Sequence, residues 1–108
     1  MLTKKAKKML HTLYKDYLNK IDNQIPADKA KYLGSADNVK NNILKSWSLK
    51  DVEEAMKELD TKGFLKNYYA DGTVHASWLT SYAIAKMENR KKEIFLNILD
   101  FISKFLSR

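Results

Sequence analysis

The segment from Ser48 to Thr80 contains the strongest structural signals in this sequence, a helix with a marked start and end followed by a tight turn. Ser48 stands three residues before Asp51, the spacing at which a serine caps a helix and an acidic side chain reaches back to it. Gly63 follows the helical pattern and can adopt the left-handed conformation that ends a helix. We therefore predict a helix over residues 48–63. Its buried stripe is expected to consist of Val52, Ala55, Met56 and Leu59.

The pair Asp71-Gly72 predicts a β-hairpin, because it is a strong turn signal between two segments rich in aromatic and branched residues, 64–70 and 73–79. A plain two-residue turn makes Tyr68 face His75. This register places two sets of side chains on opposite faces: Leu65, Tyr69, Val74 and Trp78 on one, and Phe64, Tyr68, His75 and Leu79 on the other. A lone two-stranded hairpin is marginal in water, so we expect one face to pack on helices.

Helical periodicity is also present on both sides of this segment. Thr3 is the predicted N-cap of a first, lysine-rich helix. A short helix is predicted over residues 28–33, before a glycine, and either Ser35 or Asp37 is expected to begin another. The chain is thus predicted to be a single, mainly α domain over residues 1–108, with one β-hairpin.

The composition limits the classes of protein to which the chain can belong. A net charge of +7 suits a polyanionic partner, although lysine is also an ordinary surface residue. The chain has no cysteine, and no apolar segment approaches the roughly 20 residues that cross a bilayer, so we expect a cytoplasmic protein without a membrane partner. His11 and His75 stand on separate predicted elements, without a companion metal-ligand or nucleophile pattern. We therefore expect no enzyme activity, no metal site and no cofactor.

Two short motifs resemble the segment that closes the recognition helix and follows the wing in winged-helix proteins. The pattern L-x-x-x-G-hydrophobic-hydrophobic is matched by Leu59, Gly63, Phe64 and Leu65. A Leu-Thr-x-x-small motif is matched by Leu79, Thr80 and Ala83, with alanine where glycine is usual. The chain thus resembles the winged-helix DNA-binding superfamily, including multidrug-resistance and PadR-type regulators and the YjcQ-like group of Gram-positive bacteria. The resemblance covers about residues 48–88 and implies a winged helix-turn-helix with a long C-terminal helix.

The resemblance also implies a small bacterial or mobile-element transcription regulator that binds double-stranded DNA through the predicted helix 48–63. The exposed face of that helix is predicted to carry Lys50, Glu53, Glu54, Lys57, Glu58 and Thr61. Three glutamates oppose the negative charge of DNA, so the alternative function is a winged-helix module for protein–protein interaction without DNA binding. The candidate nucleic-acid contacts are Lys40, Lys45, Lys50, Lys57, Lys66, Tyr68 and His75.

The predicted last helix, over residues 81–108 after the cap Thr80, is more apolar than a surface helix needs to be. Nine of the thirteen residues from Ile94 to Leu106 are large and apolar, which is wider than one stripe. We expect this helix to form a homodimer, because small winged-helix proteins often pair through such helices. The candidate interface residues are Ile94, Phe95, Ile98, Leu99, Phe101, Ile102 and Phe105. The alternatives are a helix packed wholly on its own domain and a membrane-surface helix, which the few basic residues of this segment disfavour.

Overall fold

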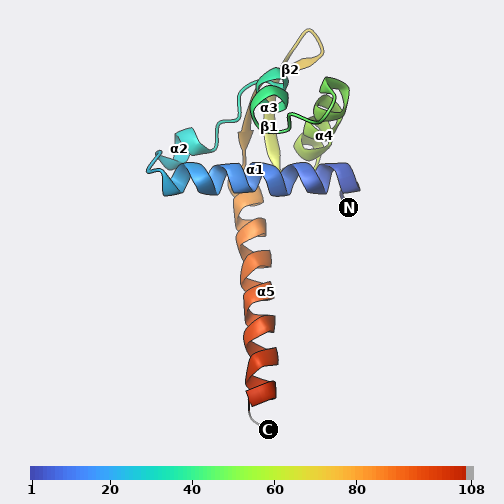
Figure 1. The fold of residues 1–108 in the computed structure, drawn as a ribbon. Helices are drawn as coiled ribbons and strands as arrows, with labels where there is room; N and C mark the ends of the chain where they lie inside the picture. The colour runs from blue at the N-terminus through green and yellow to red at the C-terminus, as the bar shows by residue number, and fades with distance from the viewer. Residues whose placement is uncertain (107–108) are drawn as a thin grey trace.

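The computed structural model describes residues 1–106, which form a mainly helical chain with one antiparallel hairpin and a long C-terminal helix, as predicted. The elements in chain order are α1 (Lys4–Asp22), α2 (Ala27–Ala30), α3 (Ala36–Asn42), α4 (Leu49–Thr61), β1 (Leu65–Ala70), β2 (Thr73–Leu79) and α5 (Ser81–Leu106). Helices α1–α4 and the hairpin form a body, and most of α5 projects from it as a single helix (Figure 1). This projection makes the molecule elongated, with extents of 62 × 31 × 24 Å.

The predicted helix caps are confirmed by hydrogen bonds. Thr3, Ser48 and Thr80 each accept a bond from the backbone N–H three residues later, at 3.2, 3.1 and 3.1 Å. Ser35, and not Asp37, begins α3 in the same way. Gly63 lies just beyond α4 with a φ of +86°, the left-handed conformation expected at a helix end. These local contacts satisfy backbone groups that the helix ends would otherwise leave without partners.

The hairpin forms at the predicted turn, between β1 and β2. Asp71 and Gly72 both have positive φ values, +52° and +76°, as a two-residue type I′ turn requires. Glycine adopts this conformation without steric cost, and aspartate is among the residues that tolerate it. The two strands then pair antiparallel as far as Leu65 and Leu79.

One extra residue in β2, His75, changes the register from the predicted one. Tyr68 pairs with Ala76 and not with His75. Because side chains alternate along a strand, this bulge moves every later residue of β2 to the opposite face. Leu79 is therefore buried, with 1% of its surface exposed, whereas Trp78 is 39% exposed. The predicted faces of these two residues are wrong, since Leu79 and not Trp78 completes the core.

The predicted helix over residues 28–33 ends early: Lys31 caps α2 in a helical conformation, and residues 32–33 are not helical. Helix α2 ends at Ala30, and Tyr32 forms an isolated antiparallel bridge with Trp78. The segment exchanges two backbone hydrogen bonds of 2.8 Å with β2, which therefore lies between β1 and this segment. Pairing with the second edge of β2 satisfies the backbone of residues 31–33 and overrides their weak local preference for a helix.

One hydrophobic core joins α1, α3, α4 and the strands to the first turns of α5. The predicted stripe of α4 is buried as expected. It packs against α1 and β1. The largest fully buried apolar side chains of the core are Met9, Leu13, Leu33, Met56, Leu59, Leu65 and Leu79. Helix α5 contributes Ala83, Ile84 and Met87.

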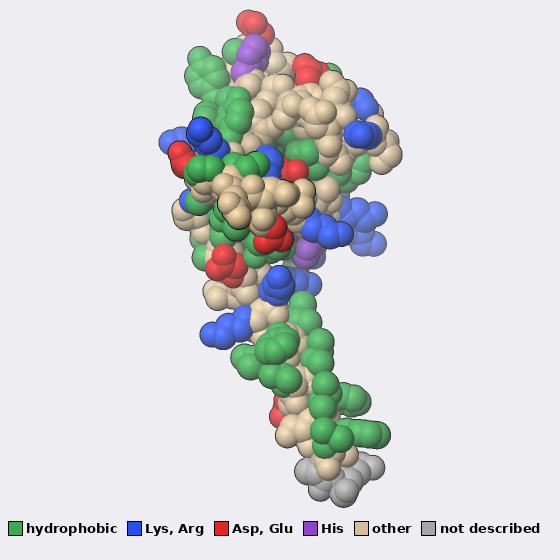
Figure 2. Space-filling view, turned by 60° about the vertical axis from the view of Figure 1, so that its left-hand side comes forward, with side chains coloured by type: hydrophobic (Ala, Val, Ile, Leu, Met, Phe, Trp, Pro, Cys, Tyr) green, Lys and Arg blue, Asp and Glu red, His purple; other side chains and the backbone are tan. Residues whose placement is uncertain are grey.

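Beyond Met87, α5 leaves the core, and large apolar side chains lie along its exposed part (Figure 2). The seven predicted interface residues between Ile94 and Phe105 are 44–70% exposed. The alternative in which this segment packs on its own domain is therefore wrong. No helix within residues 1–106 combines the length and the apolar character of a bilayer span.

A polar network beneath the hairpin holds β1 and β2 on α4. Ser77 is completely buried and donates its hydroxyl to Asn67 Oδ1. Asn67 Nδ2 in turn donates to the carbonyl oxygen of Met56 in α4, at 2.9 Å. The network supplies partners for polar atoms inside an otherwise apolar contact. Sequence reasoning missed it, because its three members belong to different elements.

Replacing Asn67 with alanine is expected to reduce the free energy of unfolding by about 1–3 kcal/mol, because the buried hydroxyl of Ser77 loses its acceptor. Chemical denaturation followed by circular dichroism measures this loss. Asn41→Ala is the matched control, since Asn41 is exposed on α3 and its removal should change stability by less than about 0.5 kcal/mol. Equal effects of the two substitutions would contradict the role assigned to Asn67.

Candidate nucleic-acid interface

The outward side of α4 is defined by the position of its buried stripe. Helical periodicity places Lys50, Lys57 and Thr61 opposite that stripe, together with Glu54. All four residues are exposed. This side of α4 therefore carries two positive charges and one negative charge.

Two further acidic residues of α4 are bound to the start of α1. Glu58 accepts hydrogen bonds from the backbone N–H and the hydroxyl of Thr3, both at 2.7 Å. Asp51 forms an ion pair of 2.8 Å with Lys5. The backbone bond from Thr3 holds the pKa of Glu58 below its usual value, and the bond from Lys5 does the same for the pKa of Asp51. Both carboxylates therefore serve contacts within the chain.

Two more acidic residues of α4 are bound to the hairpin. Glu53 accepts the backbone N–H of Val74, with both carboxylate oxygens at 3.3 Å. Asp60 accepts the hydroxyl of Tyr69 at 2.7 Å. Burial raises the pKa of Tyr69, so its phenol keeps the proton that it donates. These bonds connect the second flank of α4 to the two strands.

The predicted outer face of α4 is therefore too acidic. Glu53 is directed to the hairpin and Glu58 to α1, so that one glutamate, Glu54, stays beside Lys50 and Lys57. Periodicity alone does not separate these residues, because positions that flank a buried stripe are predicted to be exposed until neighbouring elements are placed beside them.

The connection between α3 and α4 brings together another part of the predicted set. Lys40 Nζ donates to the carbonyl oxygen of Lys45 at 3.2 Å, and Lys50 follows in the first turn of α4. A groove of about 330 Å³ at the start of α4 is lined by Lys4, Lys5, Lys8, Ser46, Trp47, Ser48 and Asp51. Lysines of α1 thus extend the basic surface beside α4, a juxtaposition that arises only when the chain folds.

Only one of the three predicted contacts on the hairpin lies beside α4. Asn67 points to α4, so the alternation of side chains along β1 directs Lys66 and Tyr68 away from it. His75, the bulged residue, is exposed and lines a shallow groove with Leu49 at the start of α4. The structure therefore groups His75 with α4 and separates Lys66 and Tyr68 from it.

A third groove, of about 420 Å³, lies between α1 and the base of α5, where Lys and Arg side chains gather (Figure 2). Its walls include the apolar residues Leu10, Phe64 and Met87 and the basic residues Lys7, Lys86 and Arg90, and His11 lies among them. Within residues 1–106, no three His, Cys, Asp or Glu side chains come together as a metal site. The groove is thus lined by both apolar and basic side chains, with one carboxylate, that of Glu93.

Glu58→Gln is expected to reduce the free energy of unfolding at neutral pH by about 1 kcal/mol, because an uncharged amide accepts the bonds from Thr3 more weakly. The folded pKa of Glu58 lies below its unfolded value of 4.5, so this stabilisation is present above pH 4.5 and is lost as the pH falls through the folded pKa. The difference between the variant and the wild type should therefore disappear in acid, which denaturation curves at neutral pH and near pH 2 measure.

The matched control is Glu54→Gln, one turn earlier on the same helix. Glu54 is exposed and acts on Lys5 through its charge, so its replacement should change stability by less than about 0.5 kcal/mol. A Glu58→Gln protein as stable as the wild type at neutral pH would show that the bonds to Thr3 do not hold α1 on α4.

No protein-family model, no curated protein and no solved structure matches the chain. The function is therefore inferred from the placement of α4, the hairpin and α5, and from the charges that these elements expose.

Proposed function

We propose that this chain is a winged-helix protein that binds double-stranded DNA, as a small bacterial or mobile-element transcription regulator of the cytoplasm. In this proposal α3 and α4 form the helix-turn-helix and the hairpin is the wing. The element order supports it, since a capped α4 is followed directly by a hairpin that packs on it and then by a long helix. The motif residues Gly63 and Thr80 stand at the end of α4 and at the start of α5, as the resemblance requires.

The observation that supports DNA binding is the position of the acidic side chains of α4. Four of its five carboxylates, all except Glu54, bind α1 or the hairpin. The outward side keeps Lys50 and Lys57, and Lys40 and Lys45 lie at the preceding turn. Such a surface gains free energy on duplex DNA by releasing condensed counterions. Three of these bound carboxylates accept from uncharged groups and keep their negative charge, but they lie on the flanks of α4 and not on its outward side.

The alternative function is a winged-helix module that binds another protein and not DNA. The exposed apolar side chains of α5 favour it, because an apolar surface of this kind marks a protein interaction site. The two functions differ in their dependence on salt. Binding to DNA weakens steeply as salt rises, whereas binding through an apolar face does not.

We also propose that α5 pairs with α5 of a second copy of the chain. The nine large apolar residues from Ile94 to Leu106 are 44–75% exposed. With side-chain areas of roughly 150–250 Å² for aromatic residues and somewhat less for aliphatic ones, they expose on the order of 800 Å². One partner of a stable complex contributes about this area. A second α5 would cover the face without any change in the body.

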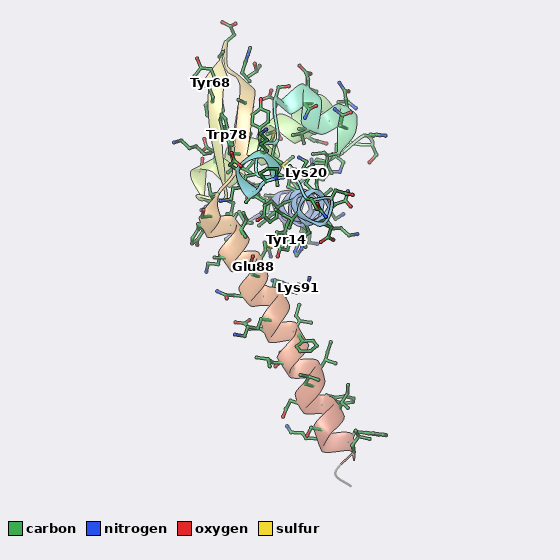
Figure 3. The ribbon with its side chains drawn as sticks, turned by 90° about the vertical axis from the view of Figure 1, so that its left-hand side faces the viewer. Tyr14, Lys20, Tyr68, Trp78, Glu88 and Lys91 are labelled. Atoms are coloured by element: carbon green, nitrogen blue, oxygen red, sulfur yellow. The ribbon has the colours of Figure 1, made fainter. Side chains whose placement is uncertain are left out.

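The charges along α5 favour an antiparallel pair. Residues 86–92 contain four basic residues and one acidic residue, whereas residues 93–106 contain two acidic residues and one basic residue. An antiparallel pair sets the basic segment of one helix beside the negative dipole end of the other. Lys91 also shares a seven-residue spacing with Ile84 and Ile98, and it lies on α5 just beyond the body (Figure 3). In a parallel pair, two Lys91 side chains would meet in the seam.

Replacing Lys50 and Lys57 together with alanine is expected to weaken binding to a random-sequence duplex by about tenfold or more at low salt. Each lysine that neutralises a phosphate adds about one to the slope of log affinity against log salt concentration, so that slope should fall by about two. Fluorescence anisotropy titrations at several salt concentrations measure both quantities.

The control variant is Lys15→Ala with Lys92→Ala, which removes the same charge from exposed positions on α1 and α5. Its affinity for duplex DNA should stay within about threefold of the wild type. A wild-type protein that does not bind the duplex even at low salt would overturn the proposal. The alternative function, a module that binds another protein, would then be favoured.

Ile98→Lys combined with Phe105→Lys is expected to convert a dimer into a folded monomer. Both side chains lie outside the core, so the new charges would be buried in the dimer seam and would leave the body intact. Sedimentation measures the association state, and circular dichroism measures the fold. A wild-type chain that stays monomeric at high concentration would rule out the pair.

Single-cysteine variants test the orientation, because the chain has no cysteine of its own. Phe105→Cys should not form a disulfide-linked dimer if the pair is antiparallel and centred near residue 97, since the two thiols would then be about 24 Å apart. In a parallel pair the same positions would meet and cross-link. Ile98→Cys lies near the centre in either orientation and is the positive control.

A further inference from the structure

The outer face of the small sheet carries three exposed aromatic side chains. Tyr32, Trp78 and Tyr68 are 44%, 39% and 63% exposed. Trp78 is bridged to Tyr32 on one side and pairs with Lys66 on the other. Tyr68 lies nearer the hairpin turn than Trp78 (Figure 3). The bulge at His75 creates this face, because it turns Trp78 away from the core.

The three rings lie on the same face of the sheet, and two of them are in contact. The ring centroids of Tyr32 and Trp78 are 5.3 Å apart, and the ring planes are tilted by 54°. Tyr68 stands two residues after Lys66, so it is the diagonal neighbour of Trp78, and such positions are about 7 Å apart. The rings thus form an extended platform, and each of them keeps much of its surface open to a ligand.

The sheet that carries these rings is basic. Residues 31–33, 65–70 and 73–79 contain two lysines and no carboxylate. Lys66 is exposed and pairs with Trp78 across the hairpin. Lys20 of α1 donates to the carbonyl oxygen of Tyr32 at 3.2 Å, and it also pairs with Asp16. The cation of Lys66 therefore stands beside the aromatic platform, and Lys20, whose charge is paired with that of Asp16, lies at its edge.

We propose that this aromatic platform binds single-stranded nucleic acid, with unpaired bases stacked on Trp78 and Tyr68 and with phosphates near Lys66 and Lys20. An unpaired base offers a flat π-face for stacking, and its phosphate requires a nearby positive charge. Duplex DNA does not use such a platform, because its bases are stacked on each other. The platform is separate from the outward side of α4 and does not depend on duplex binding there.

The test is a titration with oligo(dT) and, in parallel, with oligo(U), followed by tryptophan fluorescence. Stacking on Trp78 should quench its emission. The titration is made in a Trp47→Phe background, because Trp47 is the second of the two tryptophans in the chain. Oligo(dT) and oligo(U) differ in the 2′-hydroxyl and the thymine methyl, so their relative affinity shows whether the platform prefers DNA or RNA.

Tyr68→Ala is the informative variant, because a ring that is 63% exposed contributes little to the core. It is expected to weaken oligo(dT) binding about tenfold and to leave duplex binding within about twofold. Tyr82→Ala is the matched control, since Tyr82 is 50% exposed but lies on α5 beside Phe64. Replacing Tyr82 should leave the affinities for oligo(dT) and for duplex DNA unchanged. Lys50→Ala with Lys57→Ala should give the opposite pattern, weakening the duplex and sparing oligo(dT).

The proposal is overturned if oligo(dT) produces no quenching at low salt, or if Tyr68→Ala binds it as tightly as the wild type does. A blue shift of Trp78 emission on anionic lipid vesicles, without any response to oligonucleotides, would overturn it in favour of a lipid surface. Loss of oligo(dT) binding in the Lys50 and Lys57 variant would place both ligands on α4 and would also overturn it. Oligo(dT) binding without duplex binding would support the platform and reject the function proposed for α4.

Discussion

The packing of α4 between α1 and the hairpin is the constraint on which the rest of the structure depends. Burial of one apolar stripe sets the rotation of α4 about its own axis, and that rotation decides which charges meet which neighbour. Glu58 then meets Thr3, and Asp60 meets Tyr69. Each of these exposed bonds contributes little free energy alone. Together they hold most of the carboxylates of α4 on its flanks, and the outward side carries two lysines and one glutamate.

A single extra residue in β2 divides the hairpin into two surfaces with different chemistry. On the inner side, Asn67 and Ser77 connect the strands to α4 through a buried polar network. On the outer side, the bulge exposes Trp78 beside Tyr32 and Tyr68. The candidate DNA contacts Lys66 and Tyr68 consequently belong to the second surface. A hairpin that packs on one face only can hold the core and still present a separate binding surface.

Helix α5 is one continuous helix that lies partly in the core and partly outside the body. Its first turns bury Ala83, Ile84 and Met87, and the apolar face continues beyond the body after a basic segment. That basic segment interrupts the apolar pattern at Lys91, where the helix leaves the core. A polar residue at such a position limits the arrangements in which a second helix can pack. The basic segment therefore also restricts how α5 can pair with α5 of a second copy.

The sequence by itself determined the ends of the main helices, the position of the turn and the buried stripe of α4. These features depend on backbone groups and periodicities within a few residues, as at Ser48, Gly63 and Asp71-Gly72. Periodicity also placed Lys50 and Lys57 on the outward side of α4. The tertiary structure alone decided the bulge, the early end of α2 before residues 32–33, the partners of the acidic residues and the exposure of α5 beyond Met87. Those outcomes depend on contacts between residues that are distant in the sequence, such as Thr3 and Glu58, which are 55 positions apart. No local preference specifies which distant partner a strand edge or a carboxylate will meet.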